Sequence, residues 1–277
     1  MATETVCGIA RVKDEADIIR PVVEHMLTQV DWLLIADNAS TDGTREILAE
    51  LQTEHDAAVC VVHDDELGYF QSRQMSALAA RAAELGAEWV VPFDADEVWY
   101  SPFGRIAHVL ADQDSASIAG ALLYDHVATG TDPDDPNPLT RIGHRRVEPA
   151  KLPKVAARAR PPVTIHQGNH GADHGERVDG LLIVRHFPLR SPEQMVRKSR
   201  NGGAAYAATD LPDHIGAHWR QWSQLSDEQL GDVFREFYWE ANPTRGLIFD
   251  PAPVVSPTIT ITMDGEWRRD SGGIVPQ

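Results

Sequence analysis

Three acidic residues follow a short apolar run in the middle of the chain, where Val90–Phe93 passes directly into Asp94-Ala95-Asp96-Glu97. The apolar run predicts a buried strand of a parallel sheet. The acids would then lie at the strand's carboxyl end, where open α/β sheets bind ligands. Two neighbouring carboxylates repel each other unless a cation joins them, and their oxygens suit Mg²⁺ or Mn²⁺. The alternative is a strand-end turn with solvated acids.

A second polar cluster, Asp37–Thr44, follows the apolar segment 32–36. An acid such as Asp37 at a strand end can accept hydrogen bonds from a nucleotide base or a ribose hydroxyl. The alternative is helix capping by Ser40, Thr41 and Asp42. The sequence holds neither a Gly-x-Gly-x-x-Gly after its first apolar segment nor a Gly-Lys-Ser/Thr, so it supports neither hydride transfer nor a P-loop NTPase.

Strands and helices alternate along the first half of the chain. Ser-Pro pairs at 101–102 and 191–192 each supply an N-cap followed by Pro at the first helical position. This alternation predicts an α/β fold with a right-handed parallel sheet and helices on both faces. The predicted strands are 5–12, 32–36, 58–62, 90–93, 118–124 and 181–186; the helices are about 14–30, 44–51, 69–85, 101–110 and 191–202.

The second half is less regular. The acidic, Pro-rich stretch 131–138 predicts a mobile loop, and five histidines lie between 144 and 186. From about Leu211 a Trp-rich region predicts helices, and a tail with one β-like run, 258–263, follows. Residues 270–277 are expected to fray.

The charge of the chain limits its partners. Forty-two acids against 25 Lys and Arg give a net charge of −17, which would repel nucleic acid and anionic membranes. A phosphorylated substrate would therefore need a metal or arginines nearby. Cys7 and Cys60 fall in predicted strands and read as core residues. Without a signal peptide or an apolar run long enough to span a membrane, we expect a soluble, cytoplasmic protein.

Four segments together resemble glycosyltransferases of family 2, which have the GT-A fold, a Rossmann-like α/β fold. Three are Arg11–Glu15, with Asp14 where the family usually has Asn, Asp37–Thr44 and Asp94–Glu97. The fourth is Arg185–Ser191 followed by Lys198. Their order and spacing match, and the resemblance covers residues 5–100 well and 181–202 moderately.

This resemblance implies a nucleotide-sugar donor whose diphosphate is held by Mn²⁺ or Mg²⁺. The metal ligands it implies are Asp94, Asp96 and a histidine late in the chain, His186, with His170 as the alternative; a structural role is open for both histidines. For donor binding it implies Ala10, Arg11, Glu15, Asp37, Asn38, Asp94, Ala95, Arg190 and Lys198.

The family inverts the anomeric configuration, so the resemblance favours an inverting transfer, which needs a base near the acceptor hydroxyl. Asp173, Glu176 and Asp179 are candidates that the spacing does not rank. UDP is the favoured nucleotide, whereas the sugar, the acceptor and the oligomeric state, including a homo-oligomer, are open. We expect a nucleotide-sugar-binding half over 1–100, an acceptor-binding half over 101–205 and a helical C-terminal extension over 206–277.

Three alternatives compete with this hypothesis. A nucleotidyltransferase would attack the α-phosphate, but it usually carries a Gly-rich loop after its first strand, and residues 10–15 contain no Gly. A zinc hydrolase could use His166, His170 and His174, but the glycines between them disfavour a helix. A binding protein without turnover would have little use for two acids that repel each other, Asp94 and Asp96.

Overall fold

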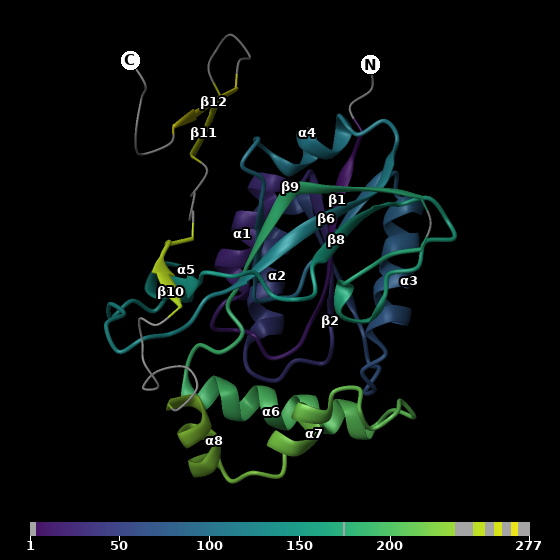
Figure 1. The fold of residues 1–277 in the computed structure, drawn as a ribbon. Helices are drawn as coiled ribbons and strands as arrows, with labels where there is room; N and C mark the ends of the chain where they lie inside the picture. Colours follow the sequence, from purple (N-terminus) through teal and green to yellow (C-terminus); the bar gives the residue numbers. More distant parts are fainter. Residues whose placement is uncertain (1–3, 174, 236–245, 253–257, 262–266, 271–277) are drawn as a thin grey trace.

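The computed structural model describes residues 4–173, 175–235, 246–252, 258–261 and 267–270. Within these ranges a mixed sheet of eight strands forms the centre of the protein, in the order β3-β2-β1-β4-β8-β6-β9-β5 (Figure 1). Its strands are β1 (Val6–Val12), β2 (Trp32–Asp37), β3 (Val59–His63), β4 (Trp89–Pro92), β5 (Glu97–Tyr100), β6 (Ala116–Asp125), β8 (Lys154–Arg158) and β9 (Glu176–His186).

One half of the sheet is parallel and the other is mixed. Strands β3, β2, β1 and β4 are parallel to their neighbours. Strand β8 is antiparallel to both β4 and β6, β6 and β9 are parallel, and β5 closes the sheet antiparallel to β9. The carboxyl ends of β1, β2, β4, β6 and β9 consequently lie along one edge of the sheet.

Helices cover both faces of this sheet and the edge where those strands end. Figure 1 shows α1 and α2 on one side, α3 on the other, and α6 to α8 as a separate layer beyond the strand ends. The longer helices are α1 (Ile19–Gln29), α2 (Thr44–His55), α3 (Gln71–Glu84), α6 (Pro192–Ala207) and α8 (Asp227–Phe234); the shorter ones are α4 (Ile106–Ala111), α5 (Pro138–Arg141) and α7 (Ala217–Trp222).

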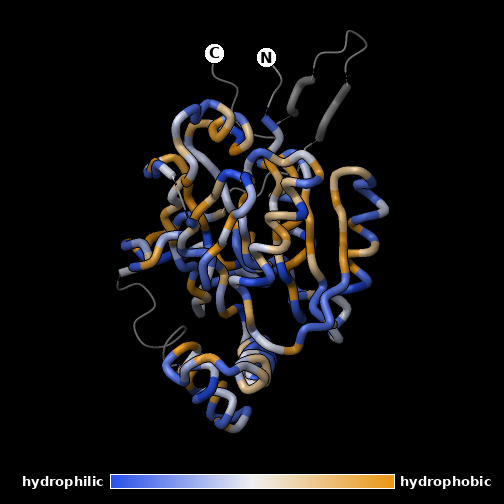
Figure 2. Tube along the Cα trace, turned by 90° about the vertical axis from the view of Figure 1, so that its right-hand side faces the viewer, coloured by the Kyte–Doolittle hydropathy of each residue, from blue (hydrophilic) through white to orange (hydrophobic). Residues whose placement is uncertain are grey.

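The core lies between the sheet and its helices. Strand β1 is buried almost throughout because both faces of the sheet are covered, and Trp89, Phe93 and Trp99 are fully enclosed. Figure 2 shows hydrophobic residues concentrated along the strands and hydrophilic residues in many connecting loops. No helix among the described residues is both long enough and apolar enough to cross a membrane.

The α/β architecture with helices on both faces is confirmed, and so are the five predicted strands of the first half to within two residues; β5 was not predicted. Helix α6 begins at the predicted place, where the Ser191 hydroxyl accepts a hydrogen bond from the Gln194 amide, and it continues to Ala207. The prediction for Ser101 was wrong. Ser101 forms a bridge with Gly104 in a tight turn after β5, and the helix begins only at Ile106.

The last part of the chain adds two small sheets. Strand β10 (Leu247–Phe249) pairs with β7 (His144–Arg146), and β11 (Thr258–Ile261) pairs with β12 (Trp267–Asp270). Strand β11 confirms the first part of the predicted β-like run, whereas positions 262–263 lie outside the described residues, as do 271–277 of the terminus that we expected to fray. The three-part division of the chain at residues 100 and 205 stays a prediction.

Candidate active site

Strand register brings four acids and a histidine to one edge of the sheet. Asp37 ends β2, and Asp94 and Asp96 follow β4. Asp125 ends β6 and His186 ends β9, and these two residues are register partners, as are His186 and Glu97. His186 therefore lies between Asp125 and the Asp94–Glu97 segment.

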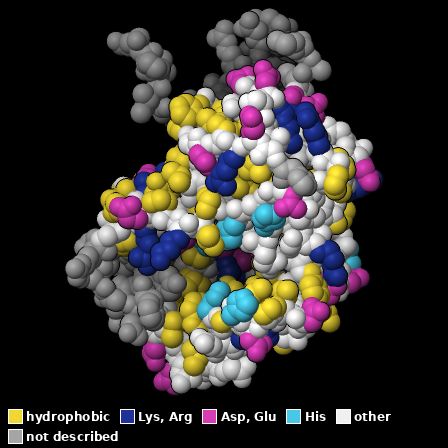
Figure 3. All heavy atoms as spheres, turned by 45° about the vertical axis from the view of Figure 1, so that its right-hand side comes forward, with side chains coloured by type: hydrophobic (Ala, Val, Ile, Leu, Met, Phe, Trp, Pro, Cys, Tyr) yellow, Lys and Arg dark blue, Asp and Glu magenta, His cyan; other side chains and the backbone are white. Residues whose placement is uncertain are grey.

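A cavity of about 380 Å³ lies between these strand ends and the helices α6 and α7. Figure 3 shows a hollow in the surface with histidine side chains on two of its sides. Of the residues implied for donor or metal binding, those that line the cavity are Arg11, Glu15, Asn38, Asp94, Ala95, Asp96, His186 and Lys198.

Asp96 lies at the centre of the charged groups in this cavity, and its carboxylate is almost fully buried. Its Oδ2 accepts a hydrogen bond from Lys198 Nζ at 2.5 Å and lies 3.6 Å from His186 Nε2 and 3.7 Å from Arg190 Nη1. Burial by itself would raise the pKa of Asp96, but the positive charges around it outweigh burial and hold the pKa well below its ordinary value.

His186 bridges two carboxylates. Its Nδ1 lies 2.8 Å from Asp125 Oδ1, and its Nε2 faces Asp96. Burial disfavours the charged ring, but Asp96 and Asp125 together raise the pKa of His186 to about 10. Without a metal the ring is therefore an imidazolium at neutral pH, and a cation that coordinates Nε2 has to displace its proton.

Asp94 is held differently from Asp96. Its Oδ1 accepts hydrogen bonds from Gln71 Nε2 at 3.1 Å and from Asn169 Nδ2 at 3.2 Å, and its Oδ2 accepts one from Lys154 Nζ at 2.7 Å. Lys154 also lies 2.7 Å from the fully buried Glu97. Both oxygens of Asp94 thus have protein partners, which fixes the carboxylate at the cavity wall.

Four of the residues implied by the family resemblance do not line the cavity. Ala10 is fully buried in β1, and the buried Asp37 accepts hydrogen bonds from Arg45 and from the Ser40 amide. Arg190 is buried and donates hydrogen bonds to Glu15 and Asp17, so its guanidinium links α6 to the chain before α1. His170 is partly buried, with Nδ1 2.9 Å from the Pro153 carbonyl oxygen.

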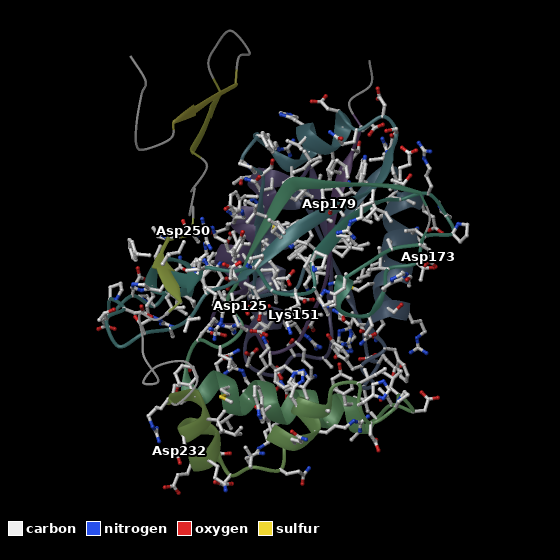
Figure 4. The ribbon with its side chains drawn as sticks, in the orientation of Figure 1. Asp125, Lys151, Asp173, Asp179, Asp232 and Asp250 are labelled. Atoms are coloured by element: carbon white, nitrogen blue, oxygen red, sulfur yellow. The ribbon has the colours of Figure 1, made fainter. Side chains whose placement is uncertain are left out.

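The three candidate bases lie away from this cavity. Asp173 pairs with His166 at 2.7 Å, and Asp179 pairs with Arg177. Glu176 and Asp179 precede His186 by ten and seven residues along β9, which at about 3.3 Å per residue places them at most about 33 and 23 Å from it. Figure 4 shows Asp179 at the end of the sheet away from α6, and Asp125 between the sheet and α6.

Aromatic residues form the cavity wall opposite the strand ends. Tyr206 of α6 and Trp219 and Trp222 of α7 line it together with Tyr69 and His218. The rings of Trp219 and Trp222 meet edge to face, with centroids 5.6 Å apart. Helix α7 can approach α6 this closely because α6 carries Gly202 and Gly203 where the two helices meet.

Sequence reasoning missed the charged partners of two site residues: Asp125, which pairs with His186, and Lys154, which pairs with Asp94. Asp125 directly follows a predicted strand, the pattern that drew attention to Asp94, so a signal was present. Lys154 opens β8, and nothing in the local sequence indicates that it reaches Asp94 and Glu97. The described residues include no group of three or more His, Cys, Asp or Glu that could hold a metal ion; His174 of the zinc alternative lies outside them.

A cavity with charged residues at the carboxyl ends of its strands is the place where open α/β sheets bind their ligands. The sequence model of glycosyl transferase family 2 matches residues 9–159, which is just over half of the 277-residue chain. The chain therefore belongs to glycosyl transferase family 2, and it is a glycosyltransferase with the GT-A type of fold. No curated protein matches it.

Solved structures with a similar course of the chain include three at low identity. Residues 1–349 of TarS from S. aureus, in complex with UDP, are 14% identical (84% of this chain and 72% of that chain covered, TM-score 0.41). The mannosyltransferase PcManGT from Pyrobaculum calidifontis, with GDP-Man and Mn²⁺, is 16% identical (83% and 72%, TM-score 0.40). GalNAc-T7 with UDP, GalNAc and Mn²⁺ is 13% identical (93% and 59%, TM-score 0.43).

Proposed function

We propose that the protein transfers a sugar from a nucleotide-sugar donor, with a UDP-sugar favoured, to an acceptor hydroxyl in a reaction that depends on a divalent metal. One observation carries this proposal: Asp96 Oδ2 and His186 Nε2 face each other at 3.6 Å in the cavity at the strand ends. A cation with bonds of about 2.1 Å fits between two atoms at this separation.

The residues present supply only part of the ligands that such a cation needs, which leaves coordination positions for a diphosphate. Asp96 and His186 supply one carboxylate and one imidazole, a pair that suits Mn²⁺ better than Mg²⁺, which prefers oxygen ligands. The remaining ligands would come from the donor diphosphate and water. When bound, the metal would neutralise the charge that develops on the departing nucleoside diphosphate.

The other side chains of the cavity are proposed to contact different parts of the donor. Arg11, Asn38 and Tyr69 lie at the side formed by the ends of β1 and β2, where the proposal places the nucleoside. Asp94, fixed by Gln71 and Lys154, is proposed to accept a hydrogen bond from a sugar or ribose hydroxyl. Lys198 supplies positive charge for the diphosphate.

The first experiment is a thermal-shift screen of UDP, GDP, dTDP and CDP, each with and without Mn²⁺ or Mg²⁺. A ligand at roughly 100 times its dissociation constant stabilises the native state by about 2.7 kcal/mol. We expect one nucleotide, with UDP favoured, to raise the unfolding temperature only when metal is present. Asp96→Asn should abolish this shift, whereas Asp65→Asn, at an exposed carboxylate paired with His63, should keep it.

Retained metal-dependent binding and turnover in Asp96→Asn would refute the metal assignment. Hydrolysis of the donor without acceptor separates the alternatives. A glycosyltransferase releases UDP and free sugar, a nucleotidyltransferase releases UMP, and a binding protein releases nothing. Proton NMR of the freshly released sugar reports its anomeric configuration. We propose inversion, and a sugar released with the donor's own configuration would contradict it.

A further inference from the structure

Each aspartate of the Asp94-Ala95-Asp96 segment has its own lysine, and the two lysines differ in their surroundings. Lys154 is enclosed, with 5% of its side chain exposed, and pairs with both Asp94 and Glu97 at 2.7 Å. Lys198 lines the cavity, with 23% exposed, and pairs with Asp96 at 2.5 Å. Of the two ammonium groups, Lys198 is the one with open space beside it.

Lys198 and the proposed metal compete for one atom. The ammonium donates its hydrogen bond to Asp96 Oδ2, the same oxygen that faces His186 Nε2. Its further contacts are the Pro188 carbonyl oxygen at 3.2 Å and Glu15 at 3.7 Å. A metal bound to Asp96 Oδ2 would add a double positive charge where Lys198, His186 and Arg190 already lie within 3.7 Å. The resulting repulsion acts on the Lys198 ammonium, the group nearest to this oxygen and the one that lines the cavity.

We propose that Lys198 is an internal counterion which divalent metal displaces from Asp96 and which the diphosphate of the donor then receives. This inference rests on the proposed function and adds a consequence to it. Metal alone binds weakly because displacement leaves the ammonium without a strong partner, and a diphosphate restores that partner. Metal and nucleoside diphosphate therefore promote each other's binding, and by linkage each does so by the same factor.

The helix that carries Lys198 is anchored, so displacement involves the side chain and not the helix. Its first turn is capped by Ser191, and Arg190 just before it is buried and bound to Asp17 at 2.7 Å. Arg197 of the same helix also reaches Asp17, at 3.1 Å. Arg190 already engages Oε2 of Glu15, which weakens the attraction of this carboxylate for the displaced ammonium. The cavity is the space into which the ammonium can turn.

The test compares Mn²⁺ binding by wild type and Lys198→Gln, measured by electron paramagnetic resonance of free Mn²⁺ with and without UDP. Without UDP we expect the variant to bind Mn²⁺ about tenfold more tightly than wild type, and we expect UDP to promote its Mn²⁺ binding about tenfold less. Lys13→Gln is the matched control. Lys13 lines the same cavity, but it donates to the Asn38 and Ala39 carbonyl oxygens, so its loss should not tighten Mn²⁺ binding.

Lys198→Arg tests whether the positive charge at this position, and not the particular shape of the lysine side chain, weakens Mn²⁺ binding. It also covers the case in which Lys198→Gln folds poorly. It keeps a cation beside Asp96, so Mn²⁺ alone should bind as weakly as in wild type. Unchanged or weaker Mn²⁺ binding by Lys198→Gln, with UDP and Mn²⁺ still binding wild type together, would overturn the counterion role and leave the proposed function intact. Failure of wild type to bind UDP with Mn²⁺ would refute the proposed function itself.

Discussion

The carboxylate of Asp125 lies 2.8 Å from Nδ1 of His186, at the point where β6 and β9 end side by side. This contact fixes the orientation of the imidazole, so that Nε2 points toward Asp96. Histidines that bind metals usually have such a partner on the other ring nitrogen, and losing it commonly costs 10- to 100-fold in metal affinity.

We predict that Asp125→Asn weakens Mn²⁺ binding in the presence of UDP by about 10- to 100-fold, because the ring loses its charged partner and its fixed orientation. A Mn²⁺ titration followed by electron paramagnetic resonance measures this. Asp173→Asn is the matched control, because Asp173 pairs with His166 at a similar 2.7 Å outside the cavity, and Mn²⁺ affinity should not change. Loss of transfer with intact Mn²⁺ affinity in Asp125→Asn would contradict the orienting role.

Replacing a glycine by alanine is predicted to have opposite effects on the free energy of unfolding in α6 and in α8. Ala usually stabilises a helix interior over Gly by up to about 1 kcal/mol. A Cβ at Gly231 in α8 would lie 3.5 Å from Arg235 Nη1, an ordinary van der Waals contact, so Gly231→Ala should stabilise the protein. A Cβ at Gly203 in α6 would come within 2.2 Å of the Ser223 Cβ, so Gly203→Ala should destabilise the protein by roughly 1–3 kcal/mol.

Urea unfolding of the two glycine variants measures the free energy of unfolding directly. Exposed Ala204→Ser, next to Gly203 in the same helix, controls for a general effect of substitutions in α6. Stabilisation by Gly203→Ala would mean that α6 and α7 do not pack as closely in solution as they do here.

The elements that the sequence predicted well depend on local patterns. The strand before Asp94 and the Ser191 cap of α6 can be read within a few residues, and the structure has both. Strand β5 was missed because its partner is β9, almost ninety residues later in the chain, which no local pattern reveals. Read locally, Ser101-Pro102 looked like the start of a helix.

The same distinction applies to the site. An acid at the end of an apolar strand is a local signal, and it placed Asp94 and Asp96 at the edge where the cavity lies. Arg190 was expected to bind the donor because the family resemblance implied it, but Glu15 and Asp17, more than 170 residues away in sequence, bind its guanidinium. The packing of α6 on the sheet determines which acidic residue pairs with which basic residue.

Lys154 is predicted to be essential for folding. It is the common partner of Asp94 and Glu97, and its removal would leave the fully buried Glu97 carboxylate without a positive partner and Asp94 with only the neutral donors Gln71 and Asn169. We expect Lys154→Met to lower the free energy of unfolding by about 3–5 kcal/mol. The double variant Lys154→Met/Glu97→Gln should recover part of this loss, because the buried charge of Glu97 is then removed. Equal stability of the single and double variants, measured by urea unfolding, would contradict this explanation.

His126 is predicted to make stability depend on pH. Its ring stacks on Phe187, its Nδ1 lies 2.8 Å from the Ile142 carbonyl oxygen, and its Nε2 lies 3.4 Å from Arg185 Nη1. Burial lowers the pKa of His126 from 6.5 to about 4, and the positive charge of Arg185 adds to this effect. The folded protein therefore keeps His126 neutral at pH values at which the unfolded chain binds a proton there.

Because the pKa is lower in the folded state, the stability that His126 contributes is complete above about pH 6.5 and is lost as the pH falls toward 4. The two pKa values correspond to a loss of roughly 3 kcal/mol. Urea unfolding at pH 7.5, 6.5, 5.5 and 4.5 should show a smaller loss in His126→Gln than in wild type. His108→Gln, at an exposed position, should behave like wild type. An equal loss in wild type and His126→Gln would show that other groups cause the acid sensitivity.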